Sequence, residues 1–320
     1  MIKKREIIVS ENFDSLRLDQ FLKTELSSVS RGYIQKIIQK GNVLINDTPC
    51  KKGDILRKDD LVYIKEILSP DEIRIKPNPS LPIKIIYEDK DIIVIDKPSG
   101  IPSHPIDFDE TDTVANFLIA KFPEIKNAGE KPLEPGMVNR LDINTSGLML
   151  VAKNRKSFEK LKYDQKQGKI KKEYLALVIG ELNESGKIKT PLAHHPKDER
   201  KMKVFASEED IKKYKARKAV TIFEVSKKYS GYTLIEVWIE KGLMHQIRVH
   251  LSSIGFPIAG DKLYQAKRFR KLDVINSDRH FLHASGLEFF HPSSGKLINF
   301  SSPLPQELEE VLRQLLSAVL

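Results

Sequence analysis

Two short clusters of polar residues stand next to apolar runs of the kind that form buried strands. The first cluster joins Asn139, Arg140 and Asp142 to a Thr-Ser-Gly turn, and the apolar run 148–152 follows directly. A guanidinium close to a carboxylate favours its charged form, which is the form that acts as a nucleophile. The same pair could equally close a turn, so this cluster alone leaves a structural and a catalytic role open.

The second cluster lies within residues 242–251 and follows a long apolar run. Arg248 could supply a cationic partner for a buried acid, and His245 and Gln246 are candidates for positioning a substrate by hydrogen bonds. His245 and His250 are five residues apart, which does not match the i,i+4 pair of a zinc-binding helix, and no acidic ligand accompanies them. We therefore expect no metal site.

Two further residues each have a functional and a structural interpretation, which for Lys97 are of equal weight. Lys97, in the turn-like sequence Asp-Lys-Pro-Ser-Gly, could contact a phosphate or stabilise the turn. Tyr174, near the start of an apolar run, could stack on an unstacked base or fill the core.

The charge of the chain indicates a polyanionic partner. Its 320 residues carry a net charge of +10, with 40% hydrophobic and 31% charged residues. Nine Lys or Arg against three acids occur in residues 153–173, and six against two in residues 262–280, whereas residues 1–80 have fifteen against twelve. Clustered Lys and Arg gain free energy by releasing counterions from phosphates, so we expect a nucleic acid to bind mainly on the C-terminal part.

Several classes of protein are excluded. The longest apolar runs, such as 92–95, are far shorter than the roughly 20 residues of a membrane helix, so we expect no membrane partner. The single cysteine, Cys50, excludes an intramolecular disulfide and a thiolate zinc cluster. No apolar segment typical of a signal peptide follows the basic N-terminus, and we expect a cytoplasmic protein.

The elements that position these residues fall into two domains joined by a linker. In residues 1–67, apolar positions at helical spacing predict two helices, one around 18–26 and one around 33–38, followed by short strands at 43–46 and 61–64. The order of these elements, with basic residues on the polar helix faces, resembles the S4 RNA-binding domain. The alternative is a small α/β module with a solvated basic face. Residues 68–82 contain four prolines and predict a linker.

Residues 83–320 are predicted to form the catalytic domain. Strand signals recur with few long helices between them, at 83–87, 92–95, 148–152, 174–179, 221–225 and 232–239. We therefore expect an α+β fold with a mixed, mainly antiparallel sheet rather than a doubly wound parallel one. In the last of these strands both alternating sets of residues are apolar or aromatic, which predicts burial on two faces.

The motifs occur together in the order seen in RluA-type pseudouridine synthases. The resemblance covers residues 83–305 and, with the S4-like part, most of the chain. The layout is similar to the branch that modifies large-subunit ribosomal RNA. The matching segments are Asp96-Lys97-Pro98-Ser99-Gly100, Arg140-Leu141-Asp142 with Thr145-Ser146-Gly147, Lys172-Glu173-Tyr174, His245-Gln246-Ile247-Arg248-Val249-His250 and Phe281-Leu282-His283-Ala284.

The resemblance implies an isomerase that converts uridine to pseudouridine without a cofactor or metal. It implies that Asp142 promotes cleavage of the ribose C1′–N1 bond, either by attack at C1′ or by removal of the C2′ proton. It further implies that Arg140 fills the space left by a flipped base, that Tyr174 stacks on uracil, and that Arg248 pairs with the catalytic carboxylate. Lys97, His245 and Gln246 are expected to contact substrate, which is most simply ribosomal RNA, with transfer RNA as the alternative.

Two departures from the family pattern keep other functions open. Asn139 stands where the family usually has His, and Leu243 stands where it usually has Arg. They leave room for a catalytically impaired RNA-binding or ribosome-assembly factor, and an unrelated hydrolase is the third hypothesis. Because Asp142, Tyr174 and Arg248 are all present, we expect an active enzyme. We also expect a monomer, since no self-association signal is evident.

Overall fold

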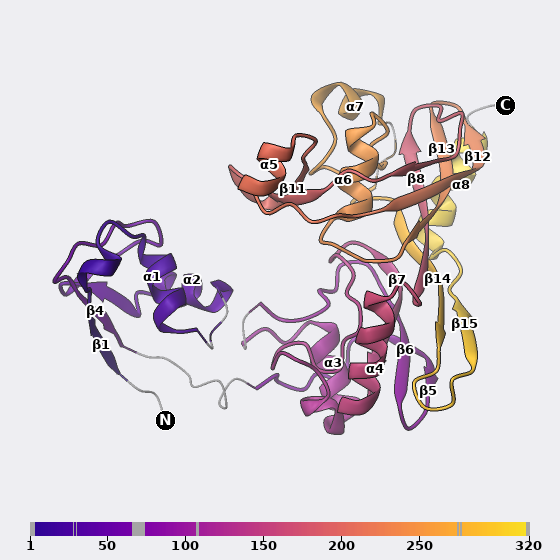
Figure 1. The fold of residues 1–320 in the computed structure, drawn as a ribbon. Helices are drawn as coiled ribbons and strands as arrows, with labels where there is room; N and C mark the ends of the chain where they lie inside the picture. Colours follow the sequence, from indigo (N-terminus) through magenta and orange to yellow (C-terminus); the bar gives the residue numbers. More distant parts are fainter. Residues whose placement is uncertain are drawn as a thin grey trace. The chain divides into compact units, whose positions relative to one another are not determined.

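The computed structural model describes residues 4–27, 29, 31–65, 74–106, 109–273, 275 and 277–317. The chain divides into two compact units (Figure 1). The first unit comprises residues 1–79, 104–123 and 130–134, and the second comprises residues 80–103, 124–129 and 135–320. Part of the expected linker, residues 68–73 with Pro70, lies outside the described residues.

The first unit contains a small sheet with two helices, as the sequence predicts. The sheet has the strand order β1-β4-β2-β3, and all of its pairs are antiparallel. The elements are β1 (Arg5–Ile8), a short 3-10 helix (Glu11–Phe13), α1 (Leu18–Glu25), α2 (Arg31–Gln39), β2 (Val43–Ile45), β3 (Thr48–Pro49), β4 (Leu61–Ile64) and α3 (Val114–Lys121).

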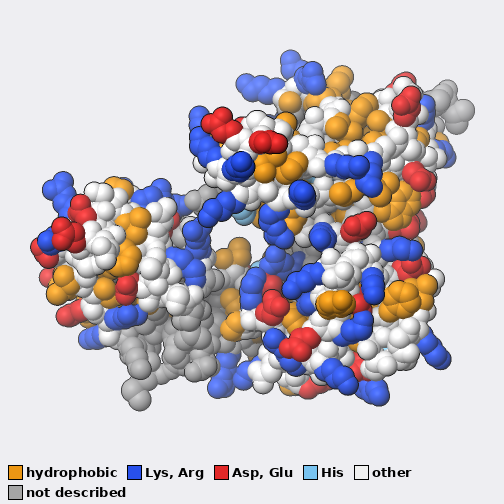
Figure 2. Space-filling model, in the orientation of Figure 1, with side chains coloured by type: hydrophobic (Ala, Val, Ile, Leu, Met, Phe, Trp, Pro, Cys, Tyr) orange, Lys and Arg blue, Asp and Glu red, His pale blue; other side chains and the backbone are white. Residues whose placement is uncertain are grey.

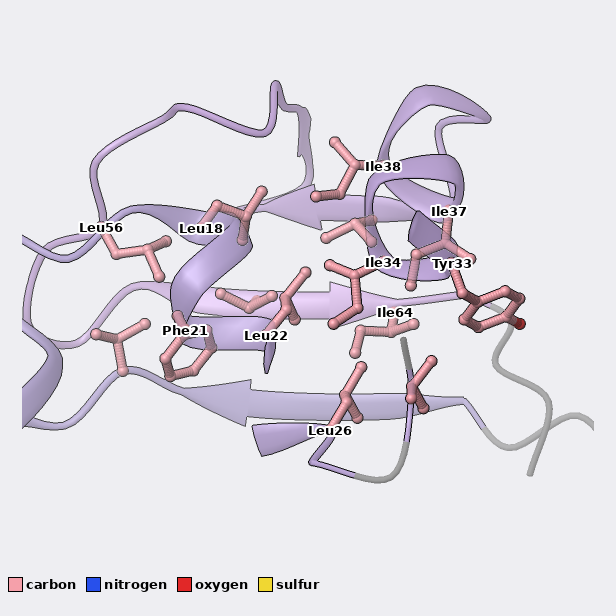
Figure 3. Packing of buried hydrophobic residues seen from close by; sticks show 14 residues of the cluster. Leu18, Phe21, Leu22, Leu26, Tyr33, Ile34, Ile37, Ile38, Leu56 and Ile64 are labelled. Atoms are coloured by element: carbon pink, nitrogen blue, oxygen red, sulfur yellow. The ribbon is translucent and has the colours of Figure 1, made fainter. Parts of the chain in front are cut away.

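One apolar cluster holds α1 and α2 against this sheet (Figure 3). Its members come from one face of each helix, because residues three and four apart share a face. Gly41 ends α2 with φ +72°, and the Asn42 N–H then donates to the Ile37 carbonyl at 2.9 Å. This C-cap needs a left-handed residue, so the glycine directs the chain into β2. The cluster includes Leu18, Phe21, Leu22, Leu26, Tyr33, Ile34, Ile37, Ile38, Leu56 and Ile64.

The second unit is built on one large mixed sheet. Its main order is β5-β6-β7-β14-β8-β13-β12-β9, and β15 pairs with β14. Only the β7–β14 pair is parallel among the pairs of described strands. The expected mixed, mainly antiparallel α+β fold is therefore confirmed. The strands are β5 (Lys84–Glu88), β6 (Ile92–Lys97), β7 (Ser146–Ala152), β8 (Lys171–Ile179), β9 (Gly186–Ile188), β12 (Thr221–Tyr229), β13 (Tyr232–Ile239), β14 (Leu282–Phe290) and β15 (Leu297–Ser301).

Helices and a hairpin surround this sheet. The hairpin pairs β10 with β11 and carries one short helix after it. Every described helix of the chain is too short or too polar to cross a membrane. These elements are α4 (Arg155–Lys166), β10 (Leu192–His195), β11 (Asp198–Val204), α5 (Glu208–Lys213), α6 (Gln246–Ser253), α7 (Lys267–Leu272) and α8 (Gln306–Ser317), with a 3-10 helix at Pro123–Asn127.

β7 and β14 pair closely, and this places the first polar cluster, which includes Asn139, Arg140 and Asp142, next to the sheet. Ser146 and Gly147 pair with His283 and Ala284 in parallel register. Gly147 has φ +111°, and a Cβ there would lie 2.2 Å from the Ala284 carbonyl oxygen. No larger residue fits this position without moving the backbone. The loop at residues 139–145 consequently enters β7 directly beside the start of β14.

The second polar cluster reaches the same region through β13. This strand pairs with β8 on one side and β12 on the other, and its residues are mostly buried on both faces, as expected. The chain then turns through residues 240–245 into α6, whose residues Gln246 to Leu251 are all buried. Two segments about a hundred residues apart in the sequence therefore contribute to one site.

Candidate active site

A shared guanidinium joins the two polar clusters. Nη1 of Arg248 donates to Oδ2 of Asp142 at 2.9 Å, while its Nε and Nη2 donate to Asp261 at 2.7 and 2.9 Å. The Asp261 side chain is 1% exposed and that of Asp142 is 20% exposed. Arg248 is thus anchored on a buried carboxylate and presents its remaining edge to a carboxylate that solvent and substrate can reach.

The charges of this triad stabilise one another. Burial alone would lower the pKa of Arg248, but the hydrogen bonds and charges of Asp261 and then Asp142 raise it above its usual value. Burial would raise the pKa of Asp261, and the Arg248 guanidinium holds it below its usual range. The guanidinium therefore stays charged at every accessible pH, and Asp142 faces a permanent cation.

Lys97 forms hydrogen bonds that hold the loop that carries Asp142. Its side chain is fully buried, and Nζ donates to the carbonyls of Pro98, Ile101 and Ile143 at 2.8 to 3.0 Å. Burial, with the charge of Arg279, lowers the pKa of Lys97 to about 7. Three carbonyl acceptors use all three N–H groups of an ammonium, so groups of the protein itself engage every donor of Lys97.

Further hydrogen bonds fix the same loop. Ser103 Oγ donates to the Leu141 carbonyl at 2.7 Å and accepts from the Leu141 N–H at 3.0 Å. Nη1 of Arg279 donates to the Asn144 carbonyl at 3.0 Å. His280 Nε2 lies 2.8 Å from the hydroxyl of Thr145. Both residues flanking Asp142 are therefore held in place, which limits the freedom of the carboxylate.

Tyr174 lies beside this carboxylate on β8. Its side chain is 5% exposed. Burial, and to a smaller extent the charge of Asp142, raises the pKa of the Tyr174 phenol above its usual value. The phenol is consequently neutral at physiological pH, and its ring offers a flat apolar surface next to Asp142.

His245 stands on the other side of Asp142. Its Nε2 is 3.8 Å from Asp142 Oδ2, and its Nδ1 is 2.8 Å from the hydroxyl of Tyr264. His245 adopts a left-handed conformation with φ 54° at the N-cap of α6, which non-glycine residues seldom do. Burial lowers the pKa of His245, so the imidazole is neutral at pH 7.

Both polar atoms of the Gln246 side chain form hydrogen bonds within the protein. Its amide nitrogen donates to the Val220 carbonyl at 2.9 Å and to the Thr221 hydroxyl at 3.2 Å, and its oxygen accepts from the Leu243 N–H at 3.1 Å. Gln246 is 2% exposed. These contacts attach the turn before α6 to β12, whereas the sequence suggested contact with substrate.

The two departures from the family pattern have local structural roles. Oδ1 of Asn139 accepts from the Leu150 N–H at 2.8 Å, which attaches the start of the loop at residues 139–145 to β7. Leu243 packs on an apolar cluster that includes Leu192, Met202 and Val249. Arg140, next to Asn139, is exposed. None of these residues interrupts the contacts between Asp142 and Arg248.

A separate group of potential metal ligands lies at the far ends of two hairpins. Ligand atoms of Asp89, Asp91 and His291 fall within 4.8 Å of one another. Hydrogen bonds already engage them: His291 Nε2 contacts Asp89 Oδ2 at 2.7 Å, and Asp91 accepts from the hydroxyls of Ser157 and Ser293. The group ties the β5–β6 turn to the β14–β15 turn, and we assign it this structural role.

Comparison with known protein families identifies the family of this chain. The family model described as "RNA pseudouridylate synthase" matches residues 91–253, which include Lys97, Asp142, Tyr174 and Arg248, and the S4 domain model matches residues 16–62. The chain belongs to the RNA pseudouridylate synthase family. It is an isomerase with an S4 domain, as the motifs indicate.

Full-length relatives support this assignment. The chain is 32% identical to "Uncharacterized RNA pseudouridine synthase YlyB" of Bacillus subtilis, with 97% of each chain covered. It is also 32% identical to "Ribosomal large subunit pseudouridine synthase D" of Xanthomonas campestris, with 97% of this chain and 92% of the relative covered. A solved structure, "Human RNA Pseudouridylate Synthase Domain Containing 1", has a TM-score of 0.56 at 24% identity, covering 77% of this chain and 97% of that one. That likeness shows the shared fold.

Four residues of this synthase's site were missed from the sequence: Asp261, Tyr264, Arg279 and His280. Asp261 lies two residues after the apolar segment 256–259, and Arg279 and His280 directly precede the segment 281–282, whereas Tyr264 lies five residues beyond 256–259. The three residues other than Tyr264 are at most 6% exposed. A charged residue that interrupts an apolar run was the available signal, because such residues are seldom buried unless paired.

Proposed function

We propose that this synthase converts specific uridines of large-subunit ribosomal RNA to pseudouridine and that Asp142 is the reacting carboxylate. The observation that supports the proposal is the difference in exposure between the two acids that pair with Arg248. Asp261 is sealed in the core, whereas Asp142 is partly exposed at the end of a braced loop. A carboxylate that is paired with a guanidinium and accessible in this way suits attack on a substrate carbon or removal of a proton.

The reaction needs a charged acid and no external reactant. The C1′–N1 bond of uridine breaks, uracil turns, and a C1′–C5 bond forms. The proton lost from C5 balances the proton gained at N1, so nothing is oxidised or reduced. Asp142 promotes the first step either by attack at C1′ or by removing the C2′ proton, and both routes fit its position.

The neighbouring residues supply orientation and a base-sized surface. Arg248 keeps the Asp142 carboxylate in place through the 2.9 Å hydrogen bond. The neutral ring of Tyr174 stacks on the flipped uracil, and exposed Arg140 occupies the space left in the RNA. For Lys97 and Gln246 we propose positioning roles, because their polar atoms already bond to protein groups.

Relatives and charge support the choice of RNA. The relatives from Xanthomonas campestris and Neisseria meningitidis are named "Ribosomal large subunit pseudouridine synthase D". On the face drawn in Figure 2, Lys and Arg side chains are spread over both units, in line with the net charge of +10. Transfer RNA is the alternative substrate. We infer a monomer in the cytoplasm, where such RNA is found.

Pseudouridine mapping tests the proposal. Chemical probing of total RNA from cells with and without the protein should reveal one or a few uridines that lose their modification. Wild-type protein should restore them, and Asp142→Asn should not, although this variant should still bind RNA. Asp47→Asn is the matched control: it removes the same charge from an exposed turn with φ 60°, a conformation that Asn tolerates.

Two outcomes would contradict different parts of the proposal. Full restoration by Asp142→Asn would remove Asp142 as the reacting group. A lost site found only in transfer RNA would leave the chemistry intact and replace ribosomal RNA as the substrate.

A further inference from the structure

A buried lysine without a partner lies one step along β8 from Tyr174. The Lys172 side chain is 4% exposed. Among the residues that the structure describes, none accepts a hydrogen bond from its Nζ or forms an ion pair with it, and the charge that contributes to its pKa is the like charge of Lys162. Buried charges are normally paired, because an isolated one loses its hydration without compensation.

The lysine nevertheless remains a cation. Burial, with the charge of Lys162, lowers the pKa of Lys172 to about 8, so most molecules carry the proton at pH 7. An apolar residue would fill this position at lower cost. A charge kept under these conditions points to a ligand of opposite charge.

The space over the ammonium is kept open by a glycine. An ideal Cβ on Gly242 would lie 3.5 Å from Nζ of Lys172 and 3.7 Å from Cδ1 of Ile239. The φ of Gly242 lies outside the left-handed region, so its backbone does not require glycine. Any side chain at this position, in the turn that leads to His245, would begin in contact with Nζ.

The position of Lys172 relates it to the catalytic residues. Lys172 and Tyr174 are two residues apart on one strand, so their side chains lie on the same face of the sheet. Lys162 on α4 adds a second ammonium, which donates to the Val138 carbonyl at 3.2 Å and to Gln165. Val138 precedes Asn139 and the catalytic loop. The cationic pair therefore borders the face on which Tyr174 and Asp142 meet.

We propose that Lys172, with Lys162 beside it and Gly242 leaving it open, forms a subsite for a phosphate group of the RNA next to the target uridine. The inference rests on the proposed function, in which a flipped nucleotide enters beside Tyr174. A phosphodiester carries the charge and acceptor oxygens that an unpaired ammonium lacks. The contact fixes the backbone of the flipped nucleotide without reading its base.

Binding of a uridine decamer to the full chain over a series of NaCl concentrations tests the subsite. Lys172→Met should weaken binding and reduce the slope of log affinity against log salt by about 0.7, the value for one lost phosphate contact on a single strand. Lys171→Met is the matched control. It removes the same charge from the adjacent residue, which is exposed and paired with Glu288 at 2.6 Å, and it should leave the slope unchanged.

Three more measurements separate a ligand subsite from a structural lysine. The unfolding temperature of Lys172→Met should equal or exceed that of the wild type, because an unpaired buried charge is removed. Gly242→Ala should fold, since its Cβ makes ordinary contacts, and should weaken decamer binding by covering Nζ. Replacing NaCl with sodium phosphate at equal ionic strength shows whether free phosphate occupies the same place.

The outcomes are distinct. Equal salt slopes for wild type, Lys172→Met and Gly242→Ala would overturn the subsite, as would a Lys172→Met variant that loses stability along with binding. Stronger competition by phosphate in the wild type than in Lys172→Met would support it. A wild-type enzyme that isomerises no uridine would overturn the proposed function, while the decamer slopes would still decide the subsite.

Discussion

The hydroxyl of Tyr264 lies 2.8 Å from Nδ1 of His245 and also accepts the Met202 N–H at 2.7 Å. Because one lone pair of the hydroxyl accepts from the backbone, we predict that the hydroxyl donates its own proton to Nδ1 of His245. The neutral imidazole then carries its proton on Nε2, the nitrogen 3.8 Å from the Asp142 carboxylate. Tyr264 in this way sets which nitrogen donates toward the reacting group.

Tyr264→Phe should release this constraint. Nitrogen NMR of histidine-labelled protein should show Nε2 protonated in the wild type and a mixture of tautomers in the variant, with the signal assigned by His245→Gln. We expect kcat to fall by on the order of tenfold, equivalent to one lost hydrogen bond, and KM to change less. Tyr163→Phe, an exposed residue on α4, is the control, and an unchanged tautomer in Tyr264→Phe would disprove the relationship.

His280 should make stability depend on pH. Burial lowers the pKa of His280 to about 4 from an ordinary value of 6.5. Its neutral form is therefore favoured by folding, so its contribution is complete above pH 6.5 and is lost as pH falls toward 4. The difference is on the order of 3 kcal/mol.

Denaturant unfolding between pH 8 and pH 4 measures this contribution. The wild type should lose stability below pH 6.5, and His280→Gln should show a shallower loss. His245, His250 and His283 also have lowered pKa values, so part of the slope remains in the variant. His194→Gln, at an exposed position, is the control variant. Equal slopes for wild type and His280→Gln would contradict the assignment.

The sequence predicted the elements well because their signals are local. Alternation and helical spacing located the strands at 92–95 and 232–239 and the helices of the S4 domain, and each is present. The family resemblance of the residues around them predicted that Arg248 pairs with Asp142. In the structure, Nη1 of Arg248 lies 2.9 Å from Oδ2 of Asp142.

The roles of Lys97, Gln246 and Asp261 were beyond a sequence argument. A lysine in a turn has the same local pattern whether its ammonium meets phosphate or three carbonyls, and only the folded loop brings Ile143 to Lys97. Asp261 is thirteen residues from Arg248, and no periodicity links them. Which polar atoms are already satisfied depends on contacts between distant segments.

Lys97→Met should impair both folding and turnover. The change leaves the carbonyls of Pro98, Ile101 and Ile143 without their donor, and each unsatisfied buried group costs about 1–3 kcal/mol. We expect a lower unfolding temperature and a reduced kcat on the mapped RNA. Lys90→Met removes an equal charge from an exposed turn and should change neither value. A Lys97→Met enzyme with normal kcat and a raised KM would instead support contact with substrate.

The S4 domain should contribute affinity without contributing chemistry. Arg31 and Lys40 are exposed basic residues at the two ends of α2. Arg31→Ser should weaken RNA binding and reduce its salt dependence, by a slope of about 0.9 if it contacts duplex phosphate, and kcat at saturating RNA should be unchanged. Filter binding and single-turnover assays separate these effects. A reduced kcat at saturation would indicate that the domain shapes the active site.

The same substitution at the two acids that pair with Arg248 should differ in its effect on stability. Asp261→Asn breaks a buried ion pair, which typically costs 3–5 kcal/mol, and frees Arg248 to shift, so stability and kcat should both fall. Asp142→Asn removes a partly exposed charge and leaves the Asp261 pair intact, so stability should change by less than about 1 kcal/mol while turnover disappears. Urea unfolding and pseudouridine formation, measured on both variants, check this contrast. Equal losses of stability would mean that Asp142 is as much a structural residue as Asp261, and its place as the reacting group would then rest on turnover alone.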